Sequence, residues 1–159
     1  MRIFFFEHMP ISSGILLFRR RPTGIEVLLV HPGGPLFKKK DAGFWGIPKG
    51  LVHADEDLLI AACREFEEEV GFAPTGPFIS LTPVKLKSGK IVHAWACEGD
   101  CDPATIKSNN FTMEWPPHSG RQMEFPEVDR AGWFTVEEAR VKMNPGQMGL
   151  VEEMWRMEE

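Results

Sequence analysis

Four glutamates crowd one short stretch of the chain, within residues 64–71 (Arg-Glu-Phe-Glu-Glu-Glu-Val-Gly). If residues 58–70 form a helix, Glu67, Glu68 and Glu69 fall in its last turn, where the helix dipole disfavours negative charge. Glu65 adds like-charge repulsion toward Glu68 and Glu69, which follow it by three and four residues. Each effect is worth about 0.3–1 kcal/mol, and all of them act in the same direction. The pattern therefore predicts a bound cation that offsets the repulsion.

A helical wheel separates these glutamates. With about 3.6 residues per turn, Glu65, Glu68 and Glu69 lie within an arc of about 100°, whereas Glu67 points away from them. An adjacent arc is apolar and is expected to face the core; it holds Leu59, Ala62, Phe66 and Val70. The three carboxylates, flanked by Arg64, thus project beside a buried seam. Ligand sets made only of oxygen select hard cations such as Mg²⁺ or Mn²⁺.

The elements that position this helix can be predicted from hydrophobic patterns and turn residues. Asp57 is a suitable N-cap and Gly71 a suitable C-terminal stop. A second helix is expected to begin after Thr135, with Glu138 completing a capping box. This second helix is expected to cover residues 136–142, and a third helix residues 147–157. Extended segments are expected at residues 12–18, 25–30, 44–48, 78–86, 90–97 and 131–134. Residues 98–120, which have little periodicity and three prolines, are predicted to form a long loop or an excursion from the body.

Length and charge restrict the class of protein. With 159 residues, the chain is predicted to form one domain over residues 1–159, and its strands and helices imply a sheet covered by helices. The net charge of −5 provides no basic field for a nucleic acid duplex or an anionic membrane, so a metal ion and local cations must attract an anionic substrate.

Cysteine usage and hydropathy predict a soluble, cytoplasmic protein. The three cysteines are odd in number and lack a two-residue spacing, which favours reduced thiols over a disulfide scaffold or a zinc site. The apolar run at residues 3–6 is too short for a signal peptide, and no apolar stretch approaches transmembrane length.

The spacing around the acidic helix resembles the Nudix box. That motif has a glycine, five residues, a glutamate, seven residues, and then Arg-Glu-apolar-any-Glu-Glu-any-Gly-apolar. Its fixed positions are filled here by Gly50, Glu56, Arg64, Glu65, Phe66, Glu68, Glu69, Gly71 and Phe72. The box covers residues 50–72, and the order of elements around it resembles the α/β/α sandwich of the Nudix family, an α+β fold with a mixed central sheet.

This resemblance implies hydrolysis of a nucleoside diphosphate linked to another moiety, in which water attacks a phosphorus of the pyrophosphate chain. By that analogy the metal ligands are Glu68, Glu69 and the backbone carbonyl of Gly50. Arg64 and Glu56 are expected to orient this acidic set, with Arg64 paired to a carboxylate. Mg²⁺, which Mn²⁺ can replace, would lower the pKa of a water, neutralise phosphate charge and align the in-line displacement.

The same resemblance implies roles for two further carboxylates. Glu65 is expected to be another metal ligand or to activate the attacking water. Many Nudix proteins supply a carboxylate from a loop shortly before a strand that bears a tryptophan, and Glu127 lies six residues ahead of Trp133. Glu127 is therefore expected to be a metal ligand or the general base, with Glu124 and Glu114 as competitors.

The residues that enter the box suggest a substrate. A Pro-Lys-Gly sequence ending at Gly50 resembles family members that hydrolyse dinucleoside polyphosphates or trim polyphosphorylated nucleotides. Lys49 and Arg121 are candidates to hold phosphate oxygens, and Trp45 and Trp115 are candidates, along with Phe44, to stack on a nucleobase. An ordinary surface role for the two cations, and a core role for Trp45, stay open.

The sequence thus predicts a Mg²⁺-dependent pyrophosphohydrolase whose partner is a small nucleotide, either a dinucleoside polyphosphate such as diadenosine tetraphosphate or a nucleoside triphosphate. One alternative is a pyrophosphatase for nucleotide sugars of the ADP-ribose kind. Another is a non-catalytic Nudix-fold sensor, although such domains commonly lack box carboxylates and none is missing here. The sequence leaves open the base, the position of attack, the number of metal ions and whether the protein is a monomer or a homodimer.

Overall fold

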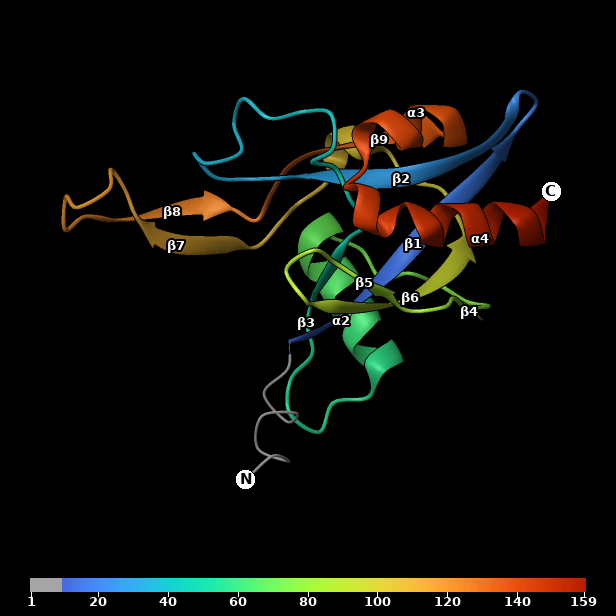
Figure 1. The fold of residues 1–159 in the computed structure, drawn as a ribbon, viewed down its shortest axis with the longest axis horizontal. Helices are drawn as coiled ribbons and strands as arrows, with labels where there is room; N and C mark the ends of the chain where they lie inside the picture. Colours follow the sequence, from blue (N-terminus) through green and yellow to red (C-terminus); the bar gives the residue numbers. More distant parts are fainter. Residues whose placement is uncertain (1–9) are drawn as a thin grey trace.

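The computed structural model describes residues 10–159, so the apolar run at residues 3–6 lies outside the described part (Figure 1). Seven strands form one mixed sheet. They are β1 (Ile11–Arg21), β2 (Gly24–Pro32), β3 (Lys49–Leu51), β4 (Ile79–Ser80), β5 (Val84–Lys85), β6 (Ile91–Glu98) and β9 (Val128–Thr135). The main path through the sheet is β4-β6-β1-β2-β9, with β3 beside β1 and β5 beside β6.

Strand β1 organises the sheet. It runs parallel to β6 and antiparallel to both β2 and β3. Strand β2 in turn pairs antiparallel with β9. The mixed sheet and the α+β class predicted from the sequence are therefore confirmed.

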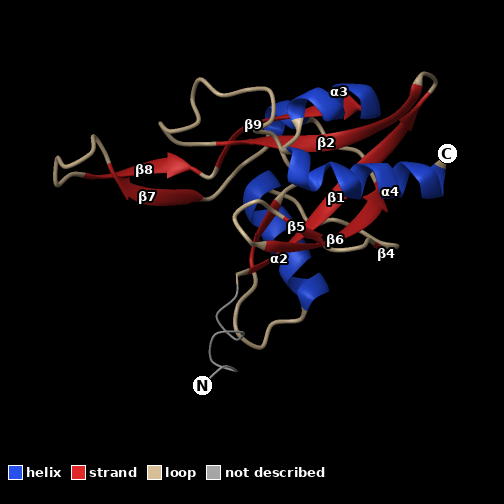
Figure 2. Ribbon diagram, in the orientation of Figure 1, coloured by secondary structure: helices blue, strands red, loops and turns tan. Residues whose placement is uncertain are grey.

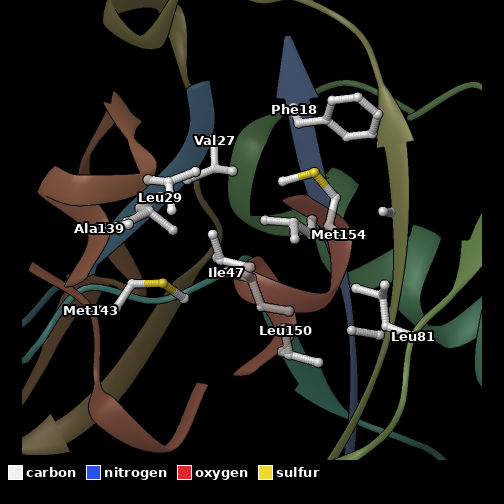
Figure 3. Close-up of a cluster of buried hydrophobic side chains, with 14 of the residues drawn as sticks. Phe18, Val27, Leu29, Ile47, Leu81, Ala139, Met143, Leu150 and Met154 are labelled. Atoms are coloured by element: carbon white, nitrogen blue, oxygen red, sulfur yellow. The ribbon is translucent and has the colours of Figure 1, made fainter. Parts of the chain in front are cut away.

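Helices cover both faces of the sheet, as Figure 2 shows. Alternate residues of β1 and β2 face opposite layers, because successive side chains of a strand point to opposite sides. Helix α2 (Leu58–Val70) packs on one face with Ile15, Leu17, Leu28 and Val30 of the sheet. Helices α3 (Val136–Lys142) and α4 (Met148–Glu158) pack on the other, against a core that includes Phe18, Val27, Leu29, Leu150 and Met154 (Figure 3). None of the helices in residues 10–159 is both long and apolar enough to cross a membrane.

The predicted helix signals are confirmed. The Asp57 side chain accepts hydrogen bonds from the first backbone N–H groups of α2, and the helix ends at Gly71, whose φ of 98° lies in the left-handed region. Thr135 and Glu138 form the capping box of α3. These caps act within a few residues of the chain, so they can be predicted without knowledge of distant contacts.

Two predictions of secondary structure were wrong. Residues 98–120 are not a continuous loop, because they contain the 3-10 turn Pro103–Thr105 and β7 (Asn110–Glu114). Strand β7 pairs with β8 (Gln122–Pro126) in a separate two-stranded sheet that projects from the body (Figure 1). The expected strand at 78–86 is interrupted between β4 and β5, where Pro83 lacks the N–H that a ladder needs.

Candidate active site

Three carboxylates converge near β3. One oxygen atom each from Glu65, Glu69 and Glu127 lies within 4.8 Å of the others. Glu65 and Glu69 are one turn apart on α2, whereas Glu127 comes from the link between β8 and β9. The Glu65 side chain is buried, with 7% of the residue exposed. Because a hard divalent cation prefers several oxygen ligands at one point, these residues fit such an ion.

The pKa values of these groups show how unfavourable the cluster is without a cation. Burial, followed by repulsion from Glu65 and Glu127, raises the pKa of Glu69 to about 8, although the Lys49 ammonium acts in the opposite direction. Burial also raises the pKa of Glu65 and of Glu127, and the Glu68 carboxylate contributes to both shifts. A bound cation would favour the ionised form of every one of these groups.

Gly50 lets the acidic helix approach β3. A Cβ atom at this position would lie 2.0 Å from Oε2 of Glu65, closer than any two such atoms can approach. Strand β3 is itself anchored to β1, where Gly50 pairs with Ser13. The glycine of the motif therefore has a packing role that is separate from the predicted role of its carbonyl.

Arg64 links the acidic groups on one side of α2. Its Nε donates to Glu56 at 2.7 Å, and its Nη1 donates to Glu65 at 2.9 Å and to Glu68 at 3.1 Å. Its Nη2 donates to the backbone carbonyl of Leu51 at 3.1 Å. The hydrogen bonds from Arg64 to Glu56, together with one from the backbone N–H of His53, lower the pKa of Glu56 to about 2. Glu68 is thus held by Arg64 and lies outside the group formed by the other three carboxylates.

Glu127 is positioned by its backbone. Its carbonyl accepts a hydrogen bond from Gly33 N–H at 2.9 Å, and its own N–H donates to the Asn109 carbonyl at 2.9 Å. A Cβ atom on Gly33 would lie only 1.9 Å from the carbonyl oxygen of Pro126. Gly33 therefore has to be glycine for Glu127 to reach the site. Sequence reasoning missed this residue, although a glycine pair directly after a strand is a signal of close backbone approach.

A cleft of about 350 Å³ opens beside the carboxylates. Lys49, Glu69 and Glu127 are among the residues that line it, and we call the part that these three residues line the acidic end. Burial lowers the pKa of Lys49, and the carboxylates partly reverse this effect. The rest of the lining includes two aromatic rings and two side-chain amides, those of Phe37, Phe44, Asn144 and Gln147.

A family model described as the NUDIX domain matches residues 9–154, which is most of the chain. The chain belongs to the Nudix family. This finding confirms the predicted family and, with it, the predicted enzyme class, a Nudix pyrophosphohydrolase.

Solved structures share this Nudix fold. The NUDIX domain of NrtR from Shewanella oneidensis, complexed with ADP ribose, is 14% identical, with a TM-score of 0.65 over 99% of this chain and 98% of that one. An Ap4A hydrolase from C. elegans, in a binary complex, is 20% identical, with a TM-score of 0.63 over 92% and 96%. A curated relative, an octanoyltransferase from Myxococcus xanthus, is 27% identical over 128 residues. That match takes in 80% of this chain but only 28% of the octanoyltransferase.

Of the neighbouring rings Phe44 and Trp45, Phe44 lines the cleft and Trp45 does not. Trp45 is 6% exposed, packs edge-on against Phe134 at 5.0 Å between ring centroids, and donates from Nε1 to Asp41 at 2.7 Å. Phe44 is 40% exposed and lines the cleft. Because neighbouring residues of an extended segment point to opposite sides, only one of this pair can face a nucleobase. The structure therefore corrects the predicted stacking role of Trp45, which belongs to the core.

The β7–β8 hairpin keeps four predicted residues away from the carboxylates of the Nudix box. At its far end the backbone N–H of Trp115 donates to the carbonyl of Arg121 at 2.9 Å. Glu114 accepts hydrogen bonds from two backbone N–H groups of the hairpin loop, and Glu124 pairs across the hairpin with Thr112. Among the described residues that line the cleft, none comes from this hairpin. Of the three carboxylates considered near Trp133, the structure brings only Glu127 to the site.

Proposed function

We propose that this Nudix protein hydrolyses a pyrophosphate bond in a nucleotide with an extended phosphate chain, either a dinucleoside polyphosphate or a nucleoside triphosphate. The observation that carries the proposal is the convergence of Glu65, Glu69 and Glu127 within 4.8 Å beside a cleft of about 350 Å³. The oxygen-only donor set supports Mg²⁺, with Mn²⁺ as a substitute. When bound, such an ion supplies a water of lowered pKa and neutralises phosphate charge.

The chain's own residues would hold the metal ion and accept the proton of the attacking water. Glu65, Glu69 and Glu127, with the Gly50 carbonyl, would hold the ion, and Glu68 would join them only by leaving Arg64. Glu65 accepts a hydrogen bond from Arg64, which opposes the burial that raises its pKa. Burial and the nearby Glu68 raise the pKa of Glu127, so we assign the proton of the attacking water to Glu127.

Lys49 and Phe44 would hold the substrate on either side of the reacting phosphorus. Lys49 lies at the acidic end, where its ammonium can hold a phosphate oxygen that the carboxylates repel. Phe44 offers an exposed ring in the same cleft for stacking. A cleft of this volume suits one nucleoside, so the rest of a long phosphate chain would extend outside it. The three free cysteines support the predicted cytoplasmic location.

The test is hydrolysis of a panel of dinucleoside polyphosphates, nucleoside triphosphates and ADP-ribose with Mg²⁺, Mn²⁺ or a chelator. Products are separated by anion-exchange chromatography, and ¹⁸O-labelled water identifies the phosphorus that is attacked. We expect metal-dependent release of a nucleotide product from the first two classes. Turnover of ADP-ribose alone would favour the nucleotide-sugar alternative. No product from any compound would favour a non-catalytic sensor.

A further inference from the structure

We propose that Ser12, Lys49 and Lys90 form a second phosphate site, which binds a phosphate group other than the two that flank the hydrolysed bond. The three side chains leave the same face of the sheet, the one that packs against α3 and α4. The inference rests on the proposed function only for the place of the reacting phosphorus at the acidic end. It narrows the substrate class, because only a chain of three or more phosphates has such an additional group.

Ser12 is the middle residue of this site. Its hydroxyl is buried, with 1% of the residue exposed, and has no hydrogen-bond partner within residues 10–159. Ser12 pairs with Leu51 of β3 on one side and with Val92 of β6 on the other. Because paired residues of neighbouring strands point to the same face, Ser12 shares the face of Val92, which belongs to the core below α3 and α4. A buried hydroxyl without a partner costs free energy, which an acceptor oxygen would recover.

Lys49 stands beside Ser12 on β3. It lies two residues before Leu51, the β3 partner of Ser12, and itself pairs with Gly14. Since alternate residues of a strand share a face, the Lys49 side chain leaves the same face as Ser12, at a diagonal position roughly 7–8 Å away. Gly14 gives it room, because a Cβ atom on Gly14 would lie 2.7 Å from Cβ of Lys49.

Lys90 stands beside Ser12 on the other flank of β1. It lies two residues before Val92, the β6 partner of Ser12. Its carbonyl accepts a hydrogen bond from the Leu86 N–H at 2.8 Å, so the ladder between β5 and β6 extends to this pair and Lys90 shares the face of Leu86. Leu86 lines the cleft together with Lys49. The two lysines therefore flank Ser12 from the two strands beside β1.

The two ammonium groups have no counter-charge of their own. Within residues 10–159 neither forms an ion pair with a carboxylate, whereas the ammonium of Lys142 pairs with an aspartate at 2.7 Å. Burial, followed by the charge of Lys90, lowers the pKa of Lys49, and the Glu69 and Glu65 carboxylates only partly oppose this shift. A phosphate group supplies the negative charge that two such cations lack, and it supplies acceptor oxygens for both ammonium groups and for the hydroxyl.

The test measures binding of imidodiphosphate and imidotriphosphate by calorimetry in buffer that contains Mg²⁺. These inorganic chains have two and three phosphate groups, and their nitrogen bridges resist hydrolysis, so the result does not depend on turnover. We expect the wild type to bind imidotriphosphate at least about 10-fold more tightly, since charge-assisted hydrogen bonds are the strong ones. In Lys90→Gln this ratio should fall below about 3-fold, while imidodiphosphate should bind as it does to the wild type.

Two further variants separate the site from general charge and from packing. Lys85 is exposed and pairs with Ile91, so it points to the opposite face from Lys90. Lys85→Gln removes the same charge there and should leave the ratio unchanged. Ser12→Ala removes only the hydroxyl and should weaken imidotriphosphate binding by about 3-fold or more. Because this hydroxyl has no partner in the free protein, the Tm of Ser12→Ala should not fall.

Equal binding of the two probes by the wild type, no binding of either probe, or an unchanged ratio in Lys90→Gln would each overturn the inference. So would an equal loss in Lys85→Gln, or wild-type affinity in Ser12→Ala. The two proposals can fail separately. A Lys90-dependent preference for imidotriphosphate without hydrolysis of any nucleotide would contradict the proposed function alone. Metal-dependent hydrolysis with a ratio that does not depend on Lys90 would contradict the second phosphate site alone.

Discussion

At the acidic end of the cleft, Glu65, Glu69 and Glu127 bring like charges together, and burial and repulsion raise their pKa values. Asn144 and Gln147 line the same cleft, and we call the part that they line the amide end. The side-chain oxygen of each accepts a hydrogen bond from a backbone N–H. The first end is electrostatically incomplete until a cation binds. The second is ordered by the protein itself before any ligand arrives.

This difference separates two kinds of function. A cluster that needs a cation can change its charge state when metal and phosphate bind, which suits a reaction step. Amides whose oxygens accept hydrogen bonds from the backbone have one orientation, which suits the positioning of a bound substrate. Changes at the acidic end should therefore alter kcat, and changes at the amide end should alter KM and the choice of substrate.

The largest effect is expected for Glu69→Gln. Replacing the carboxylate removes a proposed metal ligand, so kcat should fall by at least about 10²-fold at saturating Mg²⁺. Steady-state kinetics on the best substrate of the panel would measure this loss. Glu67→Gln is the matched control, because Glu67 is exposed on another face of the same helix, and its turnover should equal that of the wild type. Wild-type turnover in a folded Glu69→Gln protein would remove Glu69 from the site.

A pair of glycine substitutions tests the two ends directly. A Cβ atom at Gly50 would strike the Glu65 carboxylate, whereas one at Gly46 would strike the Gln147 amide. Gly50→Ala should therefore lower kcat by about 10-fold or more, since small misplacements of reacting groups are costly. Gly46→Ala should mainly raise KM. Kinetics of both folded variants would measure the contrast, and a loss of kcat in Gly46→Ala as large as in Gly50→Ala would contradict the separation.

Metal binding should stabilise the protein more at pH 8 than at pH 5. The Glu69 pKa is raised from 4.5 to about 8 in the folded protein, so the metal-free folded state binds more protons than the unfolded state between these values. Its free energy of unfolding therefore falls as pH rises through this window. A cation requires ionised ligands and reverses this loss.

Thermal unfolding with and without Mg²⁺ would measure this effect. At pH 8, Mg²⁺ at about 100 times its Kd should add about 2.7 kcal/mol, and roughly 5–10 °C in Tm, with a smaller gain at pH 5. Glu69→Gln should lose most of the gain. An equal shift at both pH values would contradict the coupling between metal and carboxylate ionisation.

The smallest effect is expected for Glu56→Gln. Hydrogen bonds from Arg64 lower the pKa of Glu56 from 4.5 to about 2, so its ionised form stabilises the folded state above pH 4.5. This contribution is lost as pH falls through about 2. The variant should have a slightly lower Tm than the wild type at pH 7, and the difference should vanish near pH 2. A gap in Tm that does not change with pH would contradict the assignment, and Asp55→Asn in the same loop serves as the control.

Much of the acidic end could be predicted because its parts are local. The bounds of α2, its Asp57 cap and its Gly71 stop depend on residues within one or two turns of each other. The separation of Glu67 from the other glutamates follows from helical geometry alone. The metal-ligand set remains a prediction, and the structure adds that Glu68 contacts Arg64 while Glu127 lies with Glu65 and Glu69.

The rest required the folded chain. The prolines of residues 98–120 led to the prediction of a loop where the β7–β8 hairpin begins. The choice between Phe44 and Trp45 as the stacking ring depended on which of the two rings faced the core. The hydrogen bond from the Ile47 N–H to the Gln147 side chain joins residues that are 100 positions apart in the sequence, so no local sequence pattern predicts it.

By itself the sequence determined the Nudix box, the helix that displays its carboxylates and the need for a cation, because helix periodicity and like-charge repulsion act over a few residues. Only the tertiary structure decided that Gly33 brings Glu127 to the site and that Asn144 and Gln147, each held by a backbone N–H, line the same cleft. Those features depend on which atoms of distant segments meet and which hydrogen bonds they satisfy, and both are properties of packing.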